Sequence, residues 1–176
     1  MIKTMIVPTD GSDHAGKAVD LAADLAEKYG ARLVILHVLL RNETAAGLRA
    51  LCDRLNAPAD LVARLDAEAE QMVTTMGSAY AEVPVMLPLS NELLETVAQL
   101  ACDRARSAAQ ERGATDIAVR IVDGAPAEVI LAAAKHENAD MIVMGSRGLG
   151  RIEGLLLGAV SQRVSHLATC TCVTVK

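Results

Sequence analysis

Short runs of β-branched and aliphatic residues alternate with longer segments of helical periodicity along most of this chain. This alternation is typical of a parallel sheet whose strands are connected by helices on both faces. The predicted strands span residues 2–8, 31–38, 117–122, 139–144 and 171–175. The predicted connecting helices span residues 13–29, 91–112, 126–137 and 158–168. We therefore predict an α/β fold with a doubly wound five-stranded parallel sheet, in the strand order 3-2-1-4-5 if the first three strands wind one way and the last two the other.

Composition limits the classes of protein and partner that fit this chain. Its 176 residues, 52% of them hydrophobic, suffice for one domain, so we predict a single domain over residues 1–176. The formal net charge is −5, no long Lys/Arg block occurs, and the only aromatic residues are two Tyr, which together disfavour nucleic acid as a partner. No signal peptide or membrane span is recognisable, and the four cysteines lack the spacing of a disulfide scaffold, so we predict a cytoplasmic protein without a membrane partner.

Residues 41–90 exceed what a single crossover between two parallel strands needs. Their composition is acidic and helical, and Pro58 marks a break between two helices. Pro84 and Pro88 enclose a short segment that we interpret as a linker. We expect a helical insertion that packs on the domain or contacts a partner protein, and we find no catalytic constellation in it.

The most informative segment is MGSRGLGRIEGLLLGAVS, residues 144–161, which follows a predicted buried strand and leads into the last helix. Gly145, Gly148 and Gly158 have no side chain that would keep an anion away from backbone N–H groups. The first turn of the last helix adds free N–H donors and a partial positive charge. We therefore expect a phosphate group to bind here.

The predicted topology places this segment opposite the end of the first strand. In a doubly wound sheet, ligands bind beyond the carboxyl ends of the strands where the winding reverses, which here lies between the first and fourth strands. Pro8, Thr9 and Asp10 end the first strand, and Met144 and Gly145 end the fourth. Asp10 can accept hydrogen bonds from a sugar or an amino group, and the end of the second strand near Val38 can offer backbone groups to a base.

Three segments resemble the universal stress protein family: IVPTDGSDHAGKAVDLAADLA near the start, DGAPAEVILAAAKHENADMIVMGSRG in the second half, and the glycine run G-x2-G-x9-G. The resemblance covers about residues 2–40 and 91–175. It implies an adenine nucleotide alpha hydrolase-like fold, usually a homodimer, that binds ATP or AMP, with or without Mg²⁺, and acts in stress response or regulation. The positions that it assigns to the nucleotide are Pro8, Asp10 and Val38 around the adenosine, Met144, Gly145 and Gly148 along the ribose and phosphates, and Gly158, Ala159, Val160 and Ser161 at the phosphate end.

Two features depart from the family pattern. Family members that bind nucleotides usually carry Ser or Thr directly after the last glycine, where this chain has Ala159. A missing hydrogen bond to a charged group costs about 1.5–3 kcal/mol, so we expect phosphate affinity to fall about tenfold to a hundredfold without being lost. The second departure is the insertion at 41–90, which follows the strand expected beside the adenine and could cover that edge.

Several residues have more than one interpretation. Asp10 is either a site residue or a helix cap shared with Ser12 or Asp13, and Arg147 either pairs with a phosphate or faces solvent. His166, Cys170 and Cys172 could supply three ligands to a metal ion, but the sequence offers no evident fourth ligand. We therefore predict no metal site. His37, within an apolar strand, is expected to be a hydrogen-bonded core residue.

From the sequence we predict a nucleotide-binding regulator. The main alternative is an interaction module that binds no nucleotide and contacts a partner protein through residues 41–90. A third interpretation is an enzyme that hydrolyses ATP slowly, although no catalytic motif supports efficient turnover. The strand at 171–175 would be an unpaired edge in a monomer, so we predict a homodimer formed by antiparallel pairing of two such strands.

Overall fold

The structure, a computed structural model, describes residues 1–76, 89–149 and 157–176. Five parallel strands form one sheet in the order β3-β2-β1-β4-β5, which confirms the predicted fold class. The strands are β1 (Thr4–Pro8), β2 (Arg32–Val38), β3 (Ile117–Val122), β4 (Met141–Gly145) and β5 (Thr171–Val175). The helices are α1 (Asp13–Tyr29), α2 (Ala45–Arg54), α3 (Ala59–Met76), α4 (Asn91–Glu111), α5 (Pro126–His136) and α6 (Ala159–Leu167).

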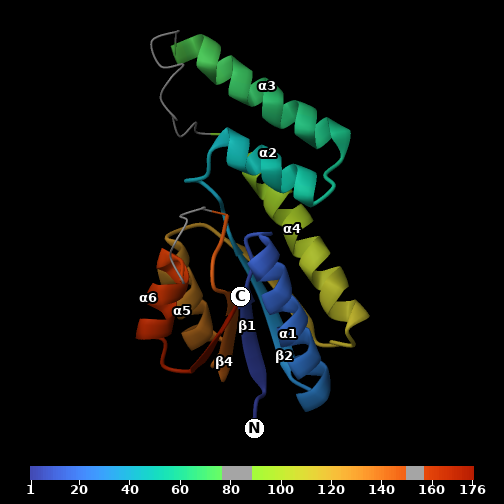
Figure 1. Cartoon of the computed structure of the whole chain (residues 1–176), viewed down its shortest axis with the longest axis vertical. Coiled ribbons are helices and arrows are strands. Elements are labelled where there is room, and N and C mark those ends of the chain that lie inside the picture. The colour runs from blue at the N-terminus through green and yellow to red at the C-terminus, as the bar shows by residue number, and fades with distance from the viewer. Residues whose placement is uncertain (77–88, 150–156) are drawn as a thin grey trace.

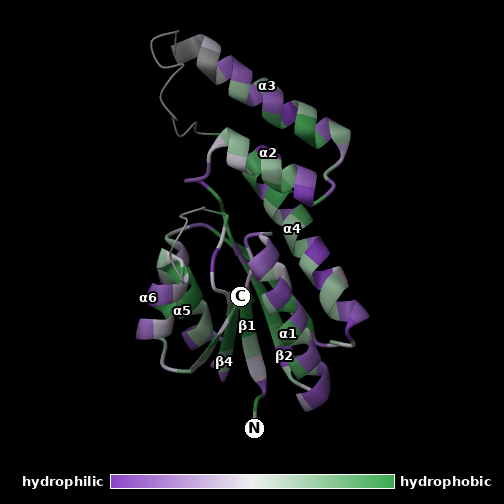
Figure 2. Ribbon diagram, in the orientation of Figure 1, coloured by the Kyte–Doolittle hydropathy of each residue, from purple (hydrophilic) through white to green (hydrophobic). Residues whose placement is uncertain are grey.

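Helices cover both faces of the sheet, with α1 and α4 on one face and α5 and α6 on the other (Figure 1). Successive residues of each strand point to opposite faces, so β1 contributes Met5 and Val7 to the first core and Ile6 to the second. The central strands are correspondingly apolar along their length, whereas the outward faces of the helices are hydrophilic (Figure 2). This two-sided burial explains why the strands are almost uniformly hydrophobic.

Small side chains let α1 lie close to the sheet. The buried face of α1 consists of Ala15, Ala18, Val19, Ala22, Ala23 and Ala26. Ser12 caps the helix by accepting a hydrogen bond from the amide of Ala15 at 3.3 Å, and Gly30 ends it in the left-handed conformation with φ of 60°. A core without Phe or Trp is therefore closed by bringing helix and sheet backbones together instead of filling the space with large side chains.

Helices α2 and α3 lie within the 41–90 segment, beyond the carboxyl ends of the strands (Figure 1). Together with the first half of α4 they enclose a third apolar cluster, which we call the insertion core. It consists of Leu48, Leu51, Cys52, Leu55, Leu61, Leu65, Leu89, Leu93, Leu94, Val97 and Ala101. Pro58 lies between α2 and α3. The linker predicted between Pro84 and Pro88 lies outside the described residues.

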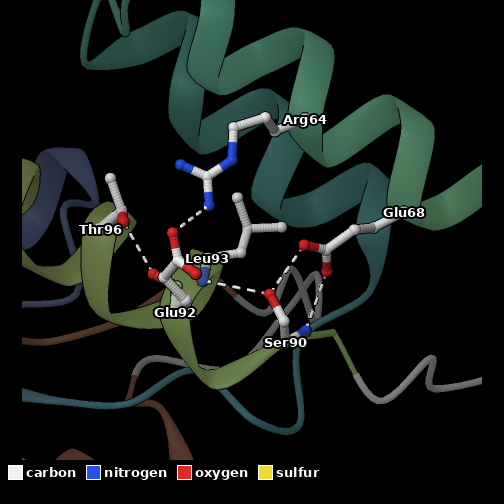
Figure 3. A network of polar contacts seen from close by, with 6 residues as sticks. All are labelled: Arg64, Glu68, Ser90, Glu92, Leu93 and Thr96. Atoms are coloured by element: carbon white, nitrogen blue, oxygen red, sulfur yellow. Dashed lines mark hydrogen bonds and ion pairs between the residues drawn. The ribbon is translucent and has the colours of Figure 1, made fainter.

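Polar contacts also connect α3 to the start of α4 (Figure 3). The carboxylate of Glu68 accepts hydrogen bonds from the amide of Ser90 at 2.9 Å and from its hydroxyl at 2.7 Å. Ser90 in turn caps α4 by accepting from the amide of Leu93, and Arg64 pairs with Glu92 at 2.8 Å. Exposed ion pairs of this kind contribute little stability individually, so the insertion core remains the main link between α3 and α4.

The four cysteines are free thiols. Burial raises the pKa of Cys102 to about 12, so this thiol stays protonated and unreactive at neutral pH. Within the described part of the chain, no helix combines the length and the hydropathy that crossing a bilayer requires.

Candidate functional site

The sheet reverses its winding direction between β1 and β4. Strands β2 and β3 lie on one side of β1, and β4 and β5 lie on the other. In register, Pro8 of β1 lies beside Leu36 of β2, and Ile6 lies beside Ile142 of β4, so the carboxyl ends of these three strands meet at one edge. This edge is where a doubly wound sheet offers room for a ligand.

A cavity of about 440 Å³ opens at this edge, on the face that α5 and α6 cover. The structure brings all of the sequence-predicted site residues to its wall: Pro8, Thr9, Asp10, Val38, Met144, Gly145, Arg147, Gly148, Gly158, Ala159, Val160 and Ser161. Their common location agrees with the prediction of one site, while their roles toward a nucleotide remain a prediction.

Other wall residues were missed by the sequence reasoning. They are Ala15, Leu36, Leu40, Glu43, Pro126, Ile130, Leu149, Leu157 and Gln162. A signal existed for some of them, because Leu36 shares a strand face with Val38, and Ile130 lies one helical turn after Pro126. For Leu40, Glu43 and Leu149, the sequence carries no comparable periodic signal.

Helix α6 begins at the cavity without a capping side chain. Gly158 is its N-cap, in an extended conformation with φ of −73° and ψ of 160°. The amide of Gly158 is already used, since it donates to the carbonyl of Ser146 at 2.7 Å. The amides of Ala159, Val160 and Ser161 are first-turn N–H groups without an acceptor inside the helix, and no side chain caps them. No described residue accepts a hydrogen bond from these three amides, so among the described residues they are donors available to the cavity.

The hydroxyl of Ser161 has an internal role. Ser161 is buried, and its Oγ lies 2.8 Å from the carbonyl oxygen of Ser146 and 2.9 Å from that of Gly158. Its single hydrogen is therefore directed to the protein's own carbonyls. The hydroxyl thus connects the glycine segment to α6, and Ser161 also offers the cavity its amide.

The three glycines of the motif are glycines for different reasons. A Cβ on Gly145 would lie 2.8 Å from the carbonyl carbon of His14, so the close approach of α1 requires glycine there. A Cβ on Gly148 would collide with the carboxylate of Asp10. A Cβ on Gly158 would meet no atom of a described residue closer than 3.5 Å, which is ordinary contact. Of the three glycines, Gly158 is thus the one whose described neighbours leave room for a side chain, so local packing does not explain why it is glycine.

Asp10 connects the two loops that face each other across the cavity. Its Oδ1 accepts from the amide of Ser12 at 2.9 Å, and its Oδ2 accepts from the amide of Leu149 at 2.9 Å. The capping role that the sequence left open belongs to Ser12. Asp10 instead fixes the glycine segment against the β1–α1 loop, and its oxygens keep further lone pairs toward the cavity.

Charged side chains of both signs line the cavity. Arg147 is half-buried and is the one basic residue among the described wall residues, where it makes no ion pair with a described carboxylate. Asp10 and Glu43 are the acidic ones. The uncapped start of α6 and Arg147 both favour an anion on the β4 side of the cavity.

His37 lies next to the site but points away from it. It alternates with Leu36 and Val38 in β2, so its ring faces the α1 and α4 side. The side chain is fully buried, and neither ring nitrogen makes a well-aligned hydrogen bond to a described residue, so the only hydrogen-bonding contact of the ring among the described residues is a poorly aligned one with the Thr9 backbone. Burial lowers the pKa of the imidazole, and the charge of Asp10 and the Thr9 backbone oppose this only in part. The fold therefore favours the neutral ring.

Comparison with known proteins places the chain in a family. The model of the universal stress protein family matches residues 1–176, and a universal stress protein of Thermus aquaticus is 32% identical over 178 residues that cover all of both chains. The chain belongs to the universal stress protein family, which confirms the resemblance drawn from its motifs.

Two solved structures of similar fold contain a bound nucleotide. A universal stress protein in complex with cAMP is 25% identical, with a TM-score of 0.60 and coverage of 99% of this chain and 96% of the other. The universal stress protein from Archaeoglobus fulgidus in complex with dAMP has a TM-score of 0.61 at 16% identity, with coverage of 100% and 98%. The second likeness is one of fold alone.

Proposed function

We propose that this protein binds an adenine nucleotide, ATP or AMP, in the cavity between β1, β4 and α6, and that it acts as a stress-response regulator. The observation that carries the proposal is the first turn of α6, where the amides of Ala159, Val160 and Ser161 meet the cavity without a capping side chain. Uncapped amides at the positive end of a helix dipole form an anion site, and phosphate fits it.

The bare backbone at Gly158 supports the same proposal. Neither its φ of −73° nor the space around a Cβ requires glycine at this position. Ser, Thr, Asp or Asn would cap α6 more effectively, but their side chains would bind the amides themselves. A glycine N-cap keeps these donors free for an external anion.

The remaining wall of the cavity suits a nucleoside. Leu36, Val38, Pro126, Ile130 and Met144 form an apolar surface on which a flat base can lie. A volume of about 440 Å³ falls within the usual range for small-molecule sites, about 300–1,000 Å³. The related structures that hold cAMP and dAMP make an adenine nucleotide the first candidate.

The proposal is tested by titrating nucleotide-stripped protein with AMP, and with ATP in the presence and absence of Mg²⁺, by isothermal calorimetry. Mass spectrometry of the small molecules released when freshly purified protein is denatured gives an independent readout. We expect saturable binding of one nucleotide per chain. No heat and no thermal shift at millimolar nucleotide would contradict the proposal and favour the interaction module that contacts a partner through residues 41–90.

We expect regulation and not rapid turnover. The Asp10 carboxylate already accepts two backbone N–H groups, so it is a poor general base for activating a water molecule. Phosphate release from ATP should therefore be slow. Rapid release that persists through repurification would make the protein an ATPase instead.

We also propose that two copies pair through β5. This strand pairs with β4 along one side, and its residues from Cys172 to Val175 are only half-buried. Antiparallel pairing with a second β5 would satisfy the backbone groups of the open edge. Light scattering coupled to size exclusion should give twice the chain mass of 18.5 kDa, and a monomer at micromolar concentration would exclude this pairing.

A further inference from the structure

The wall of the cavity has a second polar feature opposite the start of α6. Strand β2 and the segment that follows it lie on one side of β1, whereas β4, Arg147 and α6 lie on the other. Glu43 belongs to the segment after β2 and lines the cavity there. Neighbouring strands are about 4.8 Å apart, so the ends of β2 and β4 are separated by roughly 10 Å, comparable to the length of a nucleoside monophosphate.

The position of Glu43 is fixed by its own neighbours. Its Oε1 accepts hydrogen bonds from the amide of Thr44 at 3.0 Å and from the hydroxyl of Thr44 at 3.4 Å. Its own amide donates to the carbonyl of Leu40 at 3.1 Å. A Cβ on Gly47 would lie 2.7 Å from Cδ of Glu43, so the carboxylate packs directly against the backbone of Gly47 in the first turn of α2. The side chain therefore loses little further freedom when it binds a partner.

Only one oxygen of this carboxylate is used. Oε2 of Glu43 makes no hydrogen bond or ion pair with a described residue, whereas both oxygens of Asp10 accept backbone N–H groups. Among the described residues of the wall, Glu43 thus supplies the one carboxylate oxygen that accepts no hydrogen bond, so all of its lone pairs are open to an external donor. An ionised carboxylate only accepts hydrogen bonds, so the group it recognises must carry N–H or O–H.

We propose that Glu43 selects the base, by accepting a hydrogen bond from the exocyclic amine of adenine while the phosphate occupies the start of α6. This inference rests on the proposed nucleotide site. The exocyclic amine at C6 is the donor that distinguishes the outer edge of adenine from that of guanine, which carries an oxygen at the same position. Glu43 lies in the 41–90 insertion, so the insertion contributes to recognition instead of blocking the adenine edge.

The test compares AMP with purine riboside 5′-monophosphate, which is AMP without the exocyclic amine, by calorimetry on the full chain. Ribose and phosphate are identical, so the ratio of the two dissociation constants isolates the contact with the amine. For the wild type we expect AMP to bind about tenfold or more tightly, as a hydrogen bond to a charged group implies.

In the Glu43→Gln variant, which can still accept from Thr44 through its amide oxygen, the ratio should fall to within about threefold. Glu70→Gln removes the same charge from an exposed position of α3 that does not line the cavity, and it should keep the wild-type ratio. A wild-type ratio near one, or an unchanged ratio in Glu43→Gln, would overturn the role of Glu43 while leaving the nucleotide site intact. If neither nucleotide binds the wild type, the proposed function fails and this inference fails with it.

Discussion

Replacing Gly158 with Asp should stabilise the fold and weaken nucleotide binding at the same time. Gly158 is the N-cap of α6, its backbone is extended, and a Cβ there meets its nearest neighbour, the carbonyl oxygen of Ser146, at 3.5 Å. An aspartate therefore fits without strain, and its carboxylate can accept from the amide of Val160 or Ser161. These are the donors that we assign to the phosphate.

The two effects have opposite signs and different sizes. Asp exceeds Gly as an N-cap by a few tenths of a kcal/mol, and a negative charge at a helix start adds about 0.3–1 kcal/mol. In a chain of this size, ~1 kcal/mol raises the melting temperature by about 2–4 °C, so we expect a rise of a few degrees. Nucleotide affinity should fall at least tenfold to a hundredfold, because a charged hydrogen bond contributes about 1.5–3 kcal/mol and like charges now repel.

The assay pairs thermal melts without nucleotide with calorimetric titration of AMP. Gly158→Ala is the matched control, because it adds the Cβ without an acceptor: affinity should stay close to wild type, while stability should fall slightly, since Ala is a poorer N-cap than Gly. Gly158→Asn separates the cap from the charge, since it caps the helix without adding a negative charge. A melting temperature that falls in Gly158→Asp, or an affinity that stays unchanged, would refute the assignment of free amides to α6.

Three further substitutions test the start of α6, the buried His37 and the packing of α1 on β4. Ala159→Ser should raise nucleotide affinity about tenfold to a hundredfold in calorimetry, since it restores a hydroxyl at the exposed start of α6, and no gain would show that position 159 does not face the phosphate. His37→Leu should raise the free energy of unfolding by about 1–3 kcal/mol, because it removes two buried ring nitrogens that have no well-aligned hydrogen-bond partner among the described residues. The lowered pKa of His37 means that the unfolded chain binds more protons below about pH 6.5, so wild-type stability should fall as pH drops below that value, and His37→Leu should reduce the slope of urea-derived stability against pH. Gly145→Ala should destabilise by about 1–3 kcal/mol in the same assay, because its Cβ would press on the α1 backbone at His14, and a neutral result would contradict the close packing of α1 on β4.

The fold was predictable because its signals are local. Strand 171–175 and helix 13–29 were placed within their observed bounds, since a β-branched run and a small-residue stripe closed by Gly30 identify them directly. The strand order did not follow from these local signals; it rested on the assumption that the winding reverses between the third and fourth strands along the chain. Strand β1 begins at Thr4 and not at Ile2. The amides of Lys3 and Thr4 donate to the carboxylate of Asp140, which lies 136 residues or more away in the sequence. Hydrophobic periodicity cannot reveal a contact of this kind.

The membership of the site was predictable only in part. Topology identified the residues at the ends of β1 and β4, because strand ends of a doubly wound sheet meet at a known edge, and the family resemblance supplied the residues at the start of α6. The carboxylate of Asp10 on the Leu149 amide, the internal role of the Ser161 hydroxyl and the approach of Glu43 all depend on tertiary contacts between loops. Loop conformation has no periodic sequence signal, so these assignments needed the structure.

The most direct test of this account is the amide NMR spectrum of α6 during a titration with AMP. The N–H signals of Ala159, Val160 and Ser161 should move farther than those of the rest of α6, and they should saturate with the dissociation constant that calorimetry gives. If AMP binds while these three signals stay in place, the phosphate lies elsewhere, and the uncapped start of α6 does not form the anion site.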